Sequence, residues 1–249
     1  MKKVLLLALT IMLTACSSGG SLPFKSQDPA SKTNGAFNQY IIVGDSIMDM
    51  SSDELTTTAS LILLEENASV INISMAGQTM AGSNLEGGAE KDGVSGAINY
   101  LTLHGENSFV VRRNTAVIVL LGHNDWFHST SEDNFFHSYV RFLESIIRPN
   151  DSVSVFCVVP VIAAWDHNDL KNSNNVTYEA FRDVVRRVAR TGLCNLIETS
   201  NWFSEEDFHD PRIIPDGVHF AAGGHRIFKE HLIHELRKYL VNRPGLIGG

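Results

Sequence analysis

The chain has 249 residues, of which 43% are hydrophobic and 19% are charged, a composition that fits one globular domain with a sizeable core. Its formal net charge of −8 and its pI near 5.6 argue against a nucleic-acid partner, because phosphate binding draws on clustered Lys and Arg. The densest basic stretch, residues 182–190, has helical spacing with apolar residues on its other side. We interpret it as a solvated helix face.

The first residues have the pattern of a targeting segment. Lys2 and Lys3 precede an apolar run, residues 4–12, that is shorter than the roughly 20 residues a membrane-spanning helix needs. The tetrapeptide Leu13-Thr14-Ala15-Cys16 then resembles the lipobox of bacterial lipoproteins. We therefore predict a signal peptide over residues 1–15 and lipidation of Cys16. The alternative is an ordinary secretory signal with a cysteine at its end by chance.

The predicted lipid anchor continues into a segment without apolar periodicity. Residues 16–38 are rich in Ser, Gly, Lys and Pro, which is typical of a flexible tether. Ser17 and Ser18, with no Asp beside them, resemble the sorting pattern of outer-membrane lipoproteins. We expect the protein to be held to the membrane through Cys16, on the periplasmic side of the outer membrane, with a single domain over residues 39–249.

Strand and helix signals alternate from residue 39 onward. Short Val- and Ile-rich runs predict strands at residues 40–43, 69–74, 115–121, 152–159 and 193–198. Helical patterns occupy residues 53–66, 93–103, 134–147, 177–190 and 222–241. Strands without polar alternation are buried on both faces, as in a parallel sheet covered by helices. The sequence thus predicts an α/β fold, a three-layer α/β/α sandwich around a five-stranded parallel sheet.

Two further cysteines lie inside the predicted domain. Cys157 and Cys194 each belong to an apolar strand-like run, and an oxidising compartment would permit them to pair. Our strand assignments place them at different depths on neighbouring strands, whereas a disulfide needs Cα atoms within about 7 Å. We therefore expect two buried thiols.

Polar motifs follow three of the predicted strands. Gly44-Asp45-Ser46 ends the first strand, Ala76-Gly77-Gln78 follows the second and Gly122-His123-Asn124-Asp125 follows the third. The carboxyl ends of parallel strands share one rim of the sheet, where ligands bind in such folds. Asp216-Gly217-Val218-His219 precedes the last helix and can reach the same rim.

These four motifs resemble, in order and separation, the signature blocks of the SGNH (GDSL-type) serine hydrolases. The likeness covers residues 40–239, with Ile47 where the family name implies leucine. It implies a flavodoxin-like sheet topology and ester chemistry at a serine. It also assigns the oxyanion-stabilising donors to the backbone N–H groups of Ser46 and Gly77 and to the side-chain amide of Asn124. Asp45 is expected to support the turn that carries the serine.

The residues themselves point to the same chemistry. A serine hydroxyl needs a base to take its proton, and His219 follows an aspartate, Asp216, by three residues in a Gly-containing loop. That spacing allows the carboxylate to fold back on Nδ1 and leave Nε2 facing Ser46. We predict Ser46, His219 and Asp216 as nucleophile, base and orienting acid.

Each of these residues also has a purely structural interpretation. Ser46 could cap the helix that begins near residue 53, and Gly77 could be a turn glycine. Asn124 and Asp125 could be Asx-turn residues that close a strand, Asp216 could form a turn after a proline, and His219 could belong to the first turn of the last helix. All five interpretations would have to hold together on one rim, so we favour the functional one.

The sequence predicts no metal and no cofactor. Its histidines form no ligand pattern, and it contains neither a Gly-x-Gly-x-x-Gly fingerprint nor a phosphate loop. The absence of a Gly-x-Ser-x-Gly elbow argues against the α/β-hydrolase fold. Trp126 and Trp165 are expected to line the substrate site with aromatic surface. Residues 80–96, which are rich in glycine, are a candidate flap or an ordinary surface connection.

We expect a monomeric enzyme that hydrolyses a small carboxylic ester, from a lipid or an acetylated carbohydrate of the cell envelope, through an acyl-serine intermediate at Ser46. Two alternatives remain open. The same site could pass its acyl group to a sugar hydroxyl, or the fold could be a catalytically silent binding module.

Overall fold

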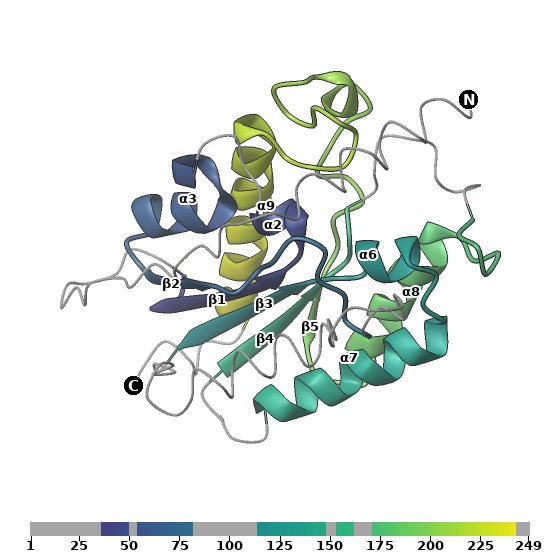
Figure 1. The fold of residues 1–249 in the computed structure, drawn as a ribbon. Coiled ribbons are helices and arrows are strands. Elements are labelled where there is room, and N and C mark those ends of the chain that lie inside the picture. Colours follow the sequence, from purple (N-terminus) through teal and green to yellow (C-terminus); the bar gives the residue numbers. More distant parts are fainter. Residues whose placement is uncertain (1–35, 50–53, 82–113, 148–152, 162–170, 243–249) are drawn as a thin grey trace.

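The computed structural model describes residues 36–49, 54–81, 114–147, 153–161 and 171–242 (Figure 1). Five parallel strands form one sheet in the order β2-β1-β3-β4-β5. The strands are β1 (Gln39–Gly44), β2 (Ser69–Asn72), β3 (Thr115–Leu120), β4 (Val153–Val158) and β5 (Asn195–Ile197). This is the flavodoxin-like order that we predict, and its switch point, where binding sites form, lies between β1 and β3.

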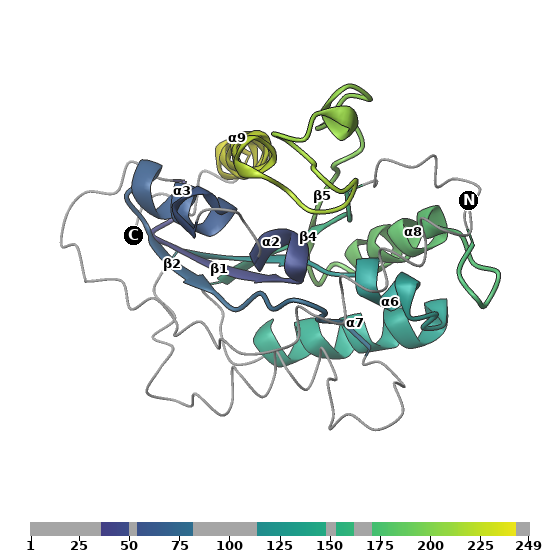
Figure 2. The same cartoon turned by 45° about the horizontal axis from the view of Figure 1, so that its top comes forward.

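Helices cover both faces of the sheet (Figures 1 and 2). The helices are α2 (Ser46–Asp49), η1 (Glu54–Thr56), α3 (Thr58–Glu65), α6 (His123–Phe127), α7 (Glu132–Ile147), α8 (Tyr178–Ala189), η2 (Asp207–His209) and α9 (Ala222–Val241). Helices α3 and α9 pack on one face, and α7 and α8 pack on the other. The three-layer prediction is confirmed.

The strand residues alternate between two cores. Tyr40 and Ile42 of β1 are fully buried in the cluster that contains α3 and α9, whereas Ile41 and Val43 face α7 and α8. Such strands have no solvent-facing side, which explains their unbroken apolar sequences. The carboxyl ends of the strands are therefore the part of the sheet where polar side chains can collect.

The observed element bounds differ from the predicted ones mainly at short helices. The predicted helix 53–66 is divided into η1 and α3, because Thr57 adopts an extended conformation and caps α3 by accepting a hydrogen bond from Ser60 N at 3.2 Å. Helices α2 and α6 were not predicted, since four or five residues contain no full apolar period.

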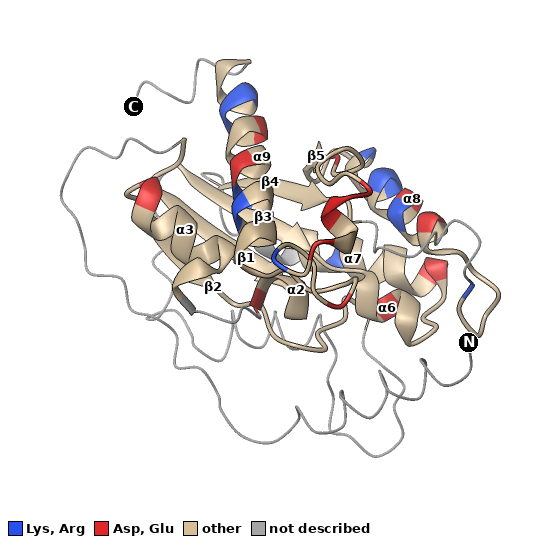
Figure 3. Cartoon of the chain, turned by 90° about the horizontal axis from the view of Figure 1, so that it is seen from above, with Lys and Arg blue, Asp and Glu red and all other residues tan. Residues whose placement is uncertain are grey.

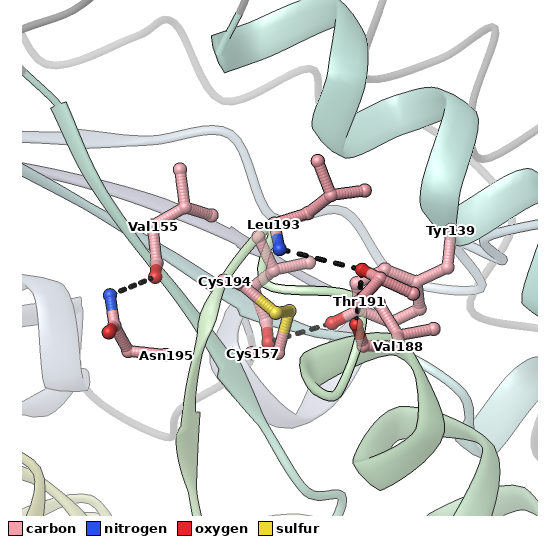
Figure 4. The surroundings of a disulfide bond; sticks show 9 residues. Tyr139, Val155, Cys157, Val188, Thr191, Leu193, Cys194 and Asn195 are labelled. Atoms are coloured by element: carbon pink, nitrogen blue, oxygen red, sulfur yellow. Dashed lines mark hydrogen bonds between the residues drawn. A yellow bond between two sulfur atoms is a disulfide. The ribbon is translucent and has the colours of Figure 1, made fainter.

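The prediction of two free thiols is wrong, because Cys157 and Cys194 form a disulfide with Cα atoms 5.8 Å apart (Figure 4). In the β4–β5 register Cys157 pairs with Leu196, two residues after Cys194. Residues two apart on a strand point to the same face, so both cysteines enter the same core. The sequence does not give the β4–β5 register, in which Asn195 lies opposite Phe156 near the end of β4, and the predicted depth of Cys194 was therefore wrong.

The basic stretch on α8 is only partly a solvated face. Arg187 and Arg190 are exposed, but Arg182 is 2% exposed. Its guanidinium donates to the carbonyl of Pro160 at 2.9 Å and to the hydroxyl of Ser200 at 2.9 Å. Charges of both signs lie along α8 (Figure 3), and Glu179 and Asp183 form ion pairs with Arg182 and Arg186.

Several predictions lie outside the described residues. They are the signal peptide, Cys16, residues 16–35 of the tether, the helix at 93–103, Trp165 and all but the first two residues of the candidate flap. The last tether residues, 36–38, are described, and Phe37 is fully buried in the same core cluster as Tyr40, so the predicted end of the tether at residue 38 is too late. Within the described ranges, no helix has the length and apolar character that crossing a membrane would require.

Candidate functional site

Ser46 stands at the carboxyl end of β1, at the point where the chain turns into α2. A Cβ atom on Gly44 would lie 2.8 Å from the side chain of Met48, so only glycine fits before the turn. The carboxylate of Asp45 accepts the N–H of Ile47 at 3.0 Å and thereby supports the turn, as expected. Helix α3 is capped by Thr57, which excludes the interpretation of Ser46 as its cap.

His219 and Asp216 lie in the loop before α9 and reach Ser46 from the other end of the chain. The ring atom Nε2 of His219 is 2.9 Å from the hydroxyl oxygen of Ser46. On the other side of the ring, Nδ1 is 2.6 Å from the carboxylate of Asp216. The second oxygen of this carboxylate accepts the backbone N–H groups of Val218 and His219, at 2.9 and 2.7 Å. Asp216 is thus both a turn former and the partner of the imidazole.

The hydrogen-bond directions in this chain follow from the charge of Asp216. Burial of this carboxylate opposes its ionisation, but hydrogen bonds from the His219 side chain and backbone outweigh that cost and hold the pKa of Asp216 at about 2. An ionised carboxylate only accepts hydrogen bonds, so Nδ1 of His219 must carry a proton. In the neutral ring Nε2 is then the acceptor, and the hydroxyl of Ser46 donates to it.

The imidazole is set up as a base. Burial of the His219 ring lowers its pKa. The hydrogen bond and the charge of Asp216, together with the charge of Asp45, raise this pKa by more than burial lowers it, so the net shift is upward. The His219 side chain is 20% exposed and that of Asp216 is 53% exposed. The base is therefore shielded, while its acid faces solvent.

Gly77 occupies a tight turn after β2. The N–H of Gln78 donates to the carbonyl of Met75 at 3.0 Å, and Gly77 has a φ of +77°, as the third residue of a type II turn requires. A Cβ atom would meet nothing within 4 Å, so the glycine is needed for its backbone conformation. Residues 75–77 are exposed.

Asn124 is the second residue of α6, which begins directly beyond the end of β3. Its side-chain amide donates to the carbonyl of Gln78 at 3.0 Å. One of the two amide hydrogens is thereby used, and the other remains for a second acceptor. Gly122, with a φ of +134°, makes the bend between β3 and α6, where a Cβ atom would lie 2.9 Å from Phe135.

Two buried carboxyl groups lie beneath this rim. Asp45 is 1% exposed and Asp125 is fully buried. Burial raises the pKa of Asp45 to about 7 and that of Asp125 to about 6. The negative charge of Asp125 adds to the upward shift of the Asp45 pKa. From the sequence, Asp125 is expected only as an Asx-turn residue beside Asn124, and no functional role is predicted for it. Its position beside Asn124 was the one available signal.

Trp126 differs from the aromatic surface expected at the site. It is 7% exposed, its indole N–H donates to the carbonyl of Val176 at 3.0 Å, and its ring packs against Tyr178 with centroids 5.3 Å apart. Trp126 therefore belongs to the core behind α6. The next residue, Phe127, is 44% exposed and offers the open aromatic surface of this helix.

No cluster of three or more His, Cys, Asp or Glu side chains that could hold a metal ion occurs within the described part of the chain.

The arrangement at the rim combines a hydroxyl with a hydrogen-bonded base and nearby amide donors. Such a set can carry out acyl transfer.

Known proteins share this sequence pattern and this fold. The sequence matches the GDSL-like Lipase/Acylhydrolase family over residues 42–227. No curated protein matches the chain. Similar solved structures include a lipase/acylhydrolase from Enterococcus faecalis, with 18% identity and a TM-score of 0.52 over 81% of this chain and 96% of that chain. A member of the lipolytic protein G-D-S-L family from Veillonella parvula has 13% identity and a TM-score of 0.57, over 79% of this chain and 96% of that chain.

A third similar structure is the salicylyl-acyltransferase SsfX3 from a tetracycline biosynthetic pathway. It has 16% identity and a TM-score of 0.62 over 86% of this chain, but only 56% of that chain is covered. At these identities the structural likenesses establish the fold alone. The family match spans most of the sequence and all four motifs at the rim, and the chain belongs to the GDSL-like lipase/acylhydrolase family.

Proposed function

We propose that this protein is a serine esterase that hydrolyses carboxylic esters through an acyl-serine intermediate. The observation that carries the proposal is the hydrogen-bonded chain from Ser46 through His219 to Asp216, with an Nε2–Oγ distance of 2.9 Å. A hydroxyl in this position can lose its proton to the imidazole as it attacks a carbonyl carbon.

In the first half of the reaction, the hydroxyl oxygen of Ser46 bonds to the ester carbonyl carbon and its proton passes to Nε2 of His219. The imidazolium is stabilised by the ionised Asp216. The tetrahedral intermediate then collapses, the bond to the leaving alcohol breaks, and His219 returns the proton to the alkoxide. In the second half, water replaces the alcohol and releases the acid from Ser46 by the same steps.

The negative oxygen of each intermediate needs hydrogen-bond donors that are already in place. We assign this role to the backbone N–H groups of Ser46 and Gly77 and to the free amide hydrogen of Asn124. Among the described residues, no acceptor takes the N–H of Ser46 or of Gly77, which supports the assignment.

A burst assay with a short p-nitrophenyl ester tests the proposal. We expect a burst of p-nitrophenolate equal to one acyl group per active site, followed by slower turnover. Ser46→Ala should abolish both phases, whereas Ser173→Ala, which alters an exposed serine outside the site, should leave both unchanged. Wild-type protein without activity on acyl chains from acetyl to palmitoyl would defeat the proposal.

We further propose that the substrate is a lipid or acetylated-carbohydrate ester of the bacterial cell envelope. The lipobox-like sequence before Cys16 supports this location, and so does the disulfide, since oxidising compartments preserve such bonds. Membrane fractionation of full-length protein and of Cys16→Ser tests the anchor. The wild type should sediment with outer membranes and the variant should not.

Acyl transfer to an alcohol is the second candidate function. The likeness to an acyltransferase structure supports it at the level of the fold, and the same acyl-Ser46 intermediate would serve both reactions. Addition of sugar acceptors during ester turnover separates the two, because a transferase forms the acylated sugar at the expense of the free acid.

A further inference from the structure

The side chain of Asp125 reaches away from its own helix to a distant segment of the chain. Its two carboxylate oxygens accept the backbone N–H groups of Met80 and Ala81, each at 2.8 Å, across 45 and 44 residues of sequence. The carboxyl group is fully buried, and Met80 is fully buried as well. The bond to Met80 is therefore shielded from water and the bond to Ala81 is partly shielded, and hydrogen bonds to a charged group are stronger in such surroundings.

The segment held in this way leads directly to the Gly77 turn. Asn124, next to Asp125 on α6, donates to the carbonyl of Gln78, so two adjacent side chains of one helix hold residues 78–81. On the other side of the turn, the N–H of Met75 donates to the carbonyl of Gly44 at 3.2 Å. The exposed turn is thus fixed at both of its ends.

We propose that Asp125 is a positioning residue for the oxyanion hole. By holding residues 80–81 against α6, it fixes the N–H of Gly77 relative to the side-chain amide of Asn124. The inference rests on the proposed function, in which these two groups stabilise the same oxygen atom. In this role Asp125 acts through residues 80–81, to which its side chain is hydrogen-bonded, and not on the substrate.

The burial of this group argues for a specific role. Burying a carboxylate costs free energy, and the pKa of Asp125, raised to about 6, reflects that cost. Two backbone N–H groups could be satisfied by a neutral acceptor, but a carboxylate offers two oxygens in one plane that accept both at once. The arrangement therefore favours a fixed geometry over stability alone.

The test combines kinetics with hydrogen exchange in Asp125→Asn. Asparagine has the same shape, but its NH₂ group would face one of the two backbone N–H groups and break one bond. We expect kcat for the ester to fall about 10- to 100-fold with KM within about threefold, since a displacement near 1 Å can cost this much. Peptides covering residues 76–81 should exchange faster. Asp133→Asn, an exposed acid on α7, serves as the matched control and should match the wild type in both measurements.

An unchanged kcat together with unchanged exchange would overturn the inference. Loss of stability without a change in kcat would also overturn it, because Asp125 would then be structural only. If Asp125→Asn fails to fold, hydrogen exchange at the amides of Met80 and Ala81 in the wild-type protein tests the inference instead. Exchange of these amides at the rate of an unstructured chain would show that Asp125 does not hold residues 80–81. Wild-type protein without esterase activity would defeat the proposed function instead, while the exchange measurement would still stand.

Discussion

Nε2 of His219 lies 2.9 Å from the hydroxyl oxygen of Ser46, although 173 residues separate the two in sequence. The sheet makes this contact possible, because Ser46 follows the end of β1 by two residues and the loop before α9 returns across the same rim. The contact joins the two ends of the described domain, and the proposed chemistry depends on it.

The first prediction concerns the pH dependence set by Asp216. The base acts when neutral, so kcat/KM should rise as pH increases through the pKa of His219, which lies above its ordinary value of 6.5. Asp216→Asn removes a hydrogen bond and a charge that raise this pKa, so the rise should move to lower pH. We also expect kcat to fall by about 10⁴, as in other serine triads. Profiles of kcat/KM against pH check both effects, and an unshifted acid limb would contradict the role of Asp216.

The second prediction concerns Asn124. Asn124→Ala should lower kcat by about 10²–10³ with little change in KM, because the lost donor acts on charge that develops only in the transition state. Binding of a boronic acid that mimics the tetrahedral intermediate should weaken in parallel. Asn134→Ala, on the exposed start of α7, is the control. Equal losses in kcat and in ground-state binding would count against the oxyanion role.

The third prediction links Asp45 to stability. Its pKa rises from the ordinary 3.8 to about 7 in the folded state, so the folded protein holds this proton more tightly than the unfolded chain does. The free energy of unfolding should therefore decrease as pH rises from about 4 to 7, by an amount on the order of 1–3 kcal/mol. Asp45→Asn keeps the acceptor for Ile47 N–H and removes the titration. Urea unfolding from pH 5 to pH 8 should give a flatter dependence for the variant than for the wild type or Asp133→Asn. If the free energy of unfolding depends on pH equally in the wild type and in Asp45→Asn, titration of Asp45 is not the cause of that dependence.

The fourth prediction concerns the disulfide. It closes a loop between residues 37 apart, which in the chain-entropy description corresponds to about 3–4 kcal/mol. The double variant Cys157→Ala and Cys194→Ala should lose about that much stability. Its kcat at low temperature should be unchanged, because the disulfide contacts none of the three residues that we assign to acyl transfer. Dithiothreitol should lower the Tm of the wild type and leave that of the variant unaffected. A variant as stable as the wild type would reject this account.

The sequence was sufficient to predict the parallel sheet and to predict that the four motifs share one rim of it. Apolar runs such as that of β3 are buried on both faces, so their assignment to a parallel sheet follows from composition alone. Once the strands are parallel, the motifs that follow them must share an edge. Ser46, Gly77 and Asn124 could therefore be placed together without coordinates.

Contacts that depend on depth or on a distant partner could not be predicted. The pairing of Cys194 with Cys157 depends on the register between β4 and β5, which no local pattern in the sequence gives. Arg182 has the spacing of an exposed helical residue, but Pro160, two residues beyond the end of β4, provides a carbonyl that accepts a hydrogen bond from it. Asp125 binds N–H groups 44 and 45 residues away, and no local pattern reveals that connection.

Asp216 and His219 are three residues apart, and their hydrogen bond is made within one short loop. The hydrogen bond between the Asp216 carboxylate and the His219 imidazole therefore does not depend on the sheet, whereas the alignment of the imidazole with Ser46 depends on the whole tertiary structure. A variant in which α9 packs a little differently would leave the histidine with its elevated pKa and no serine in reach. NMR titration of that ring and ester turnover would then report separate events, one local in the chain and the other global.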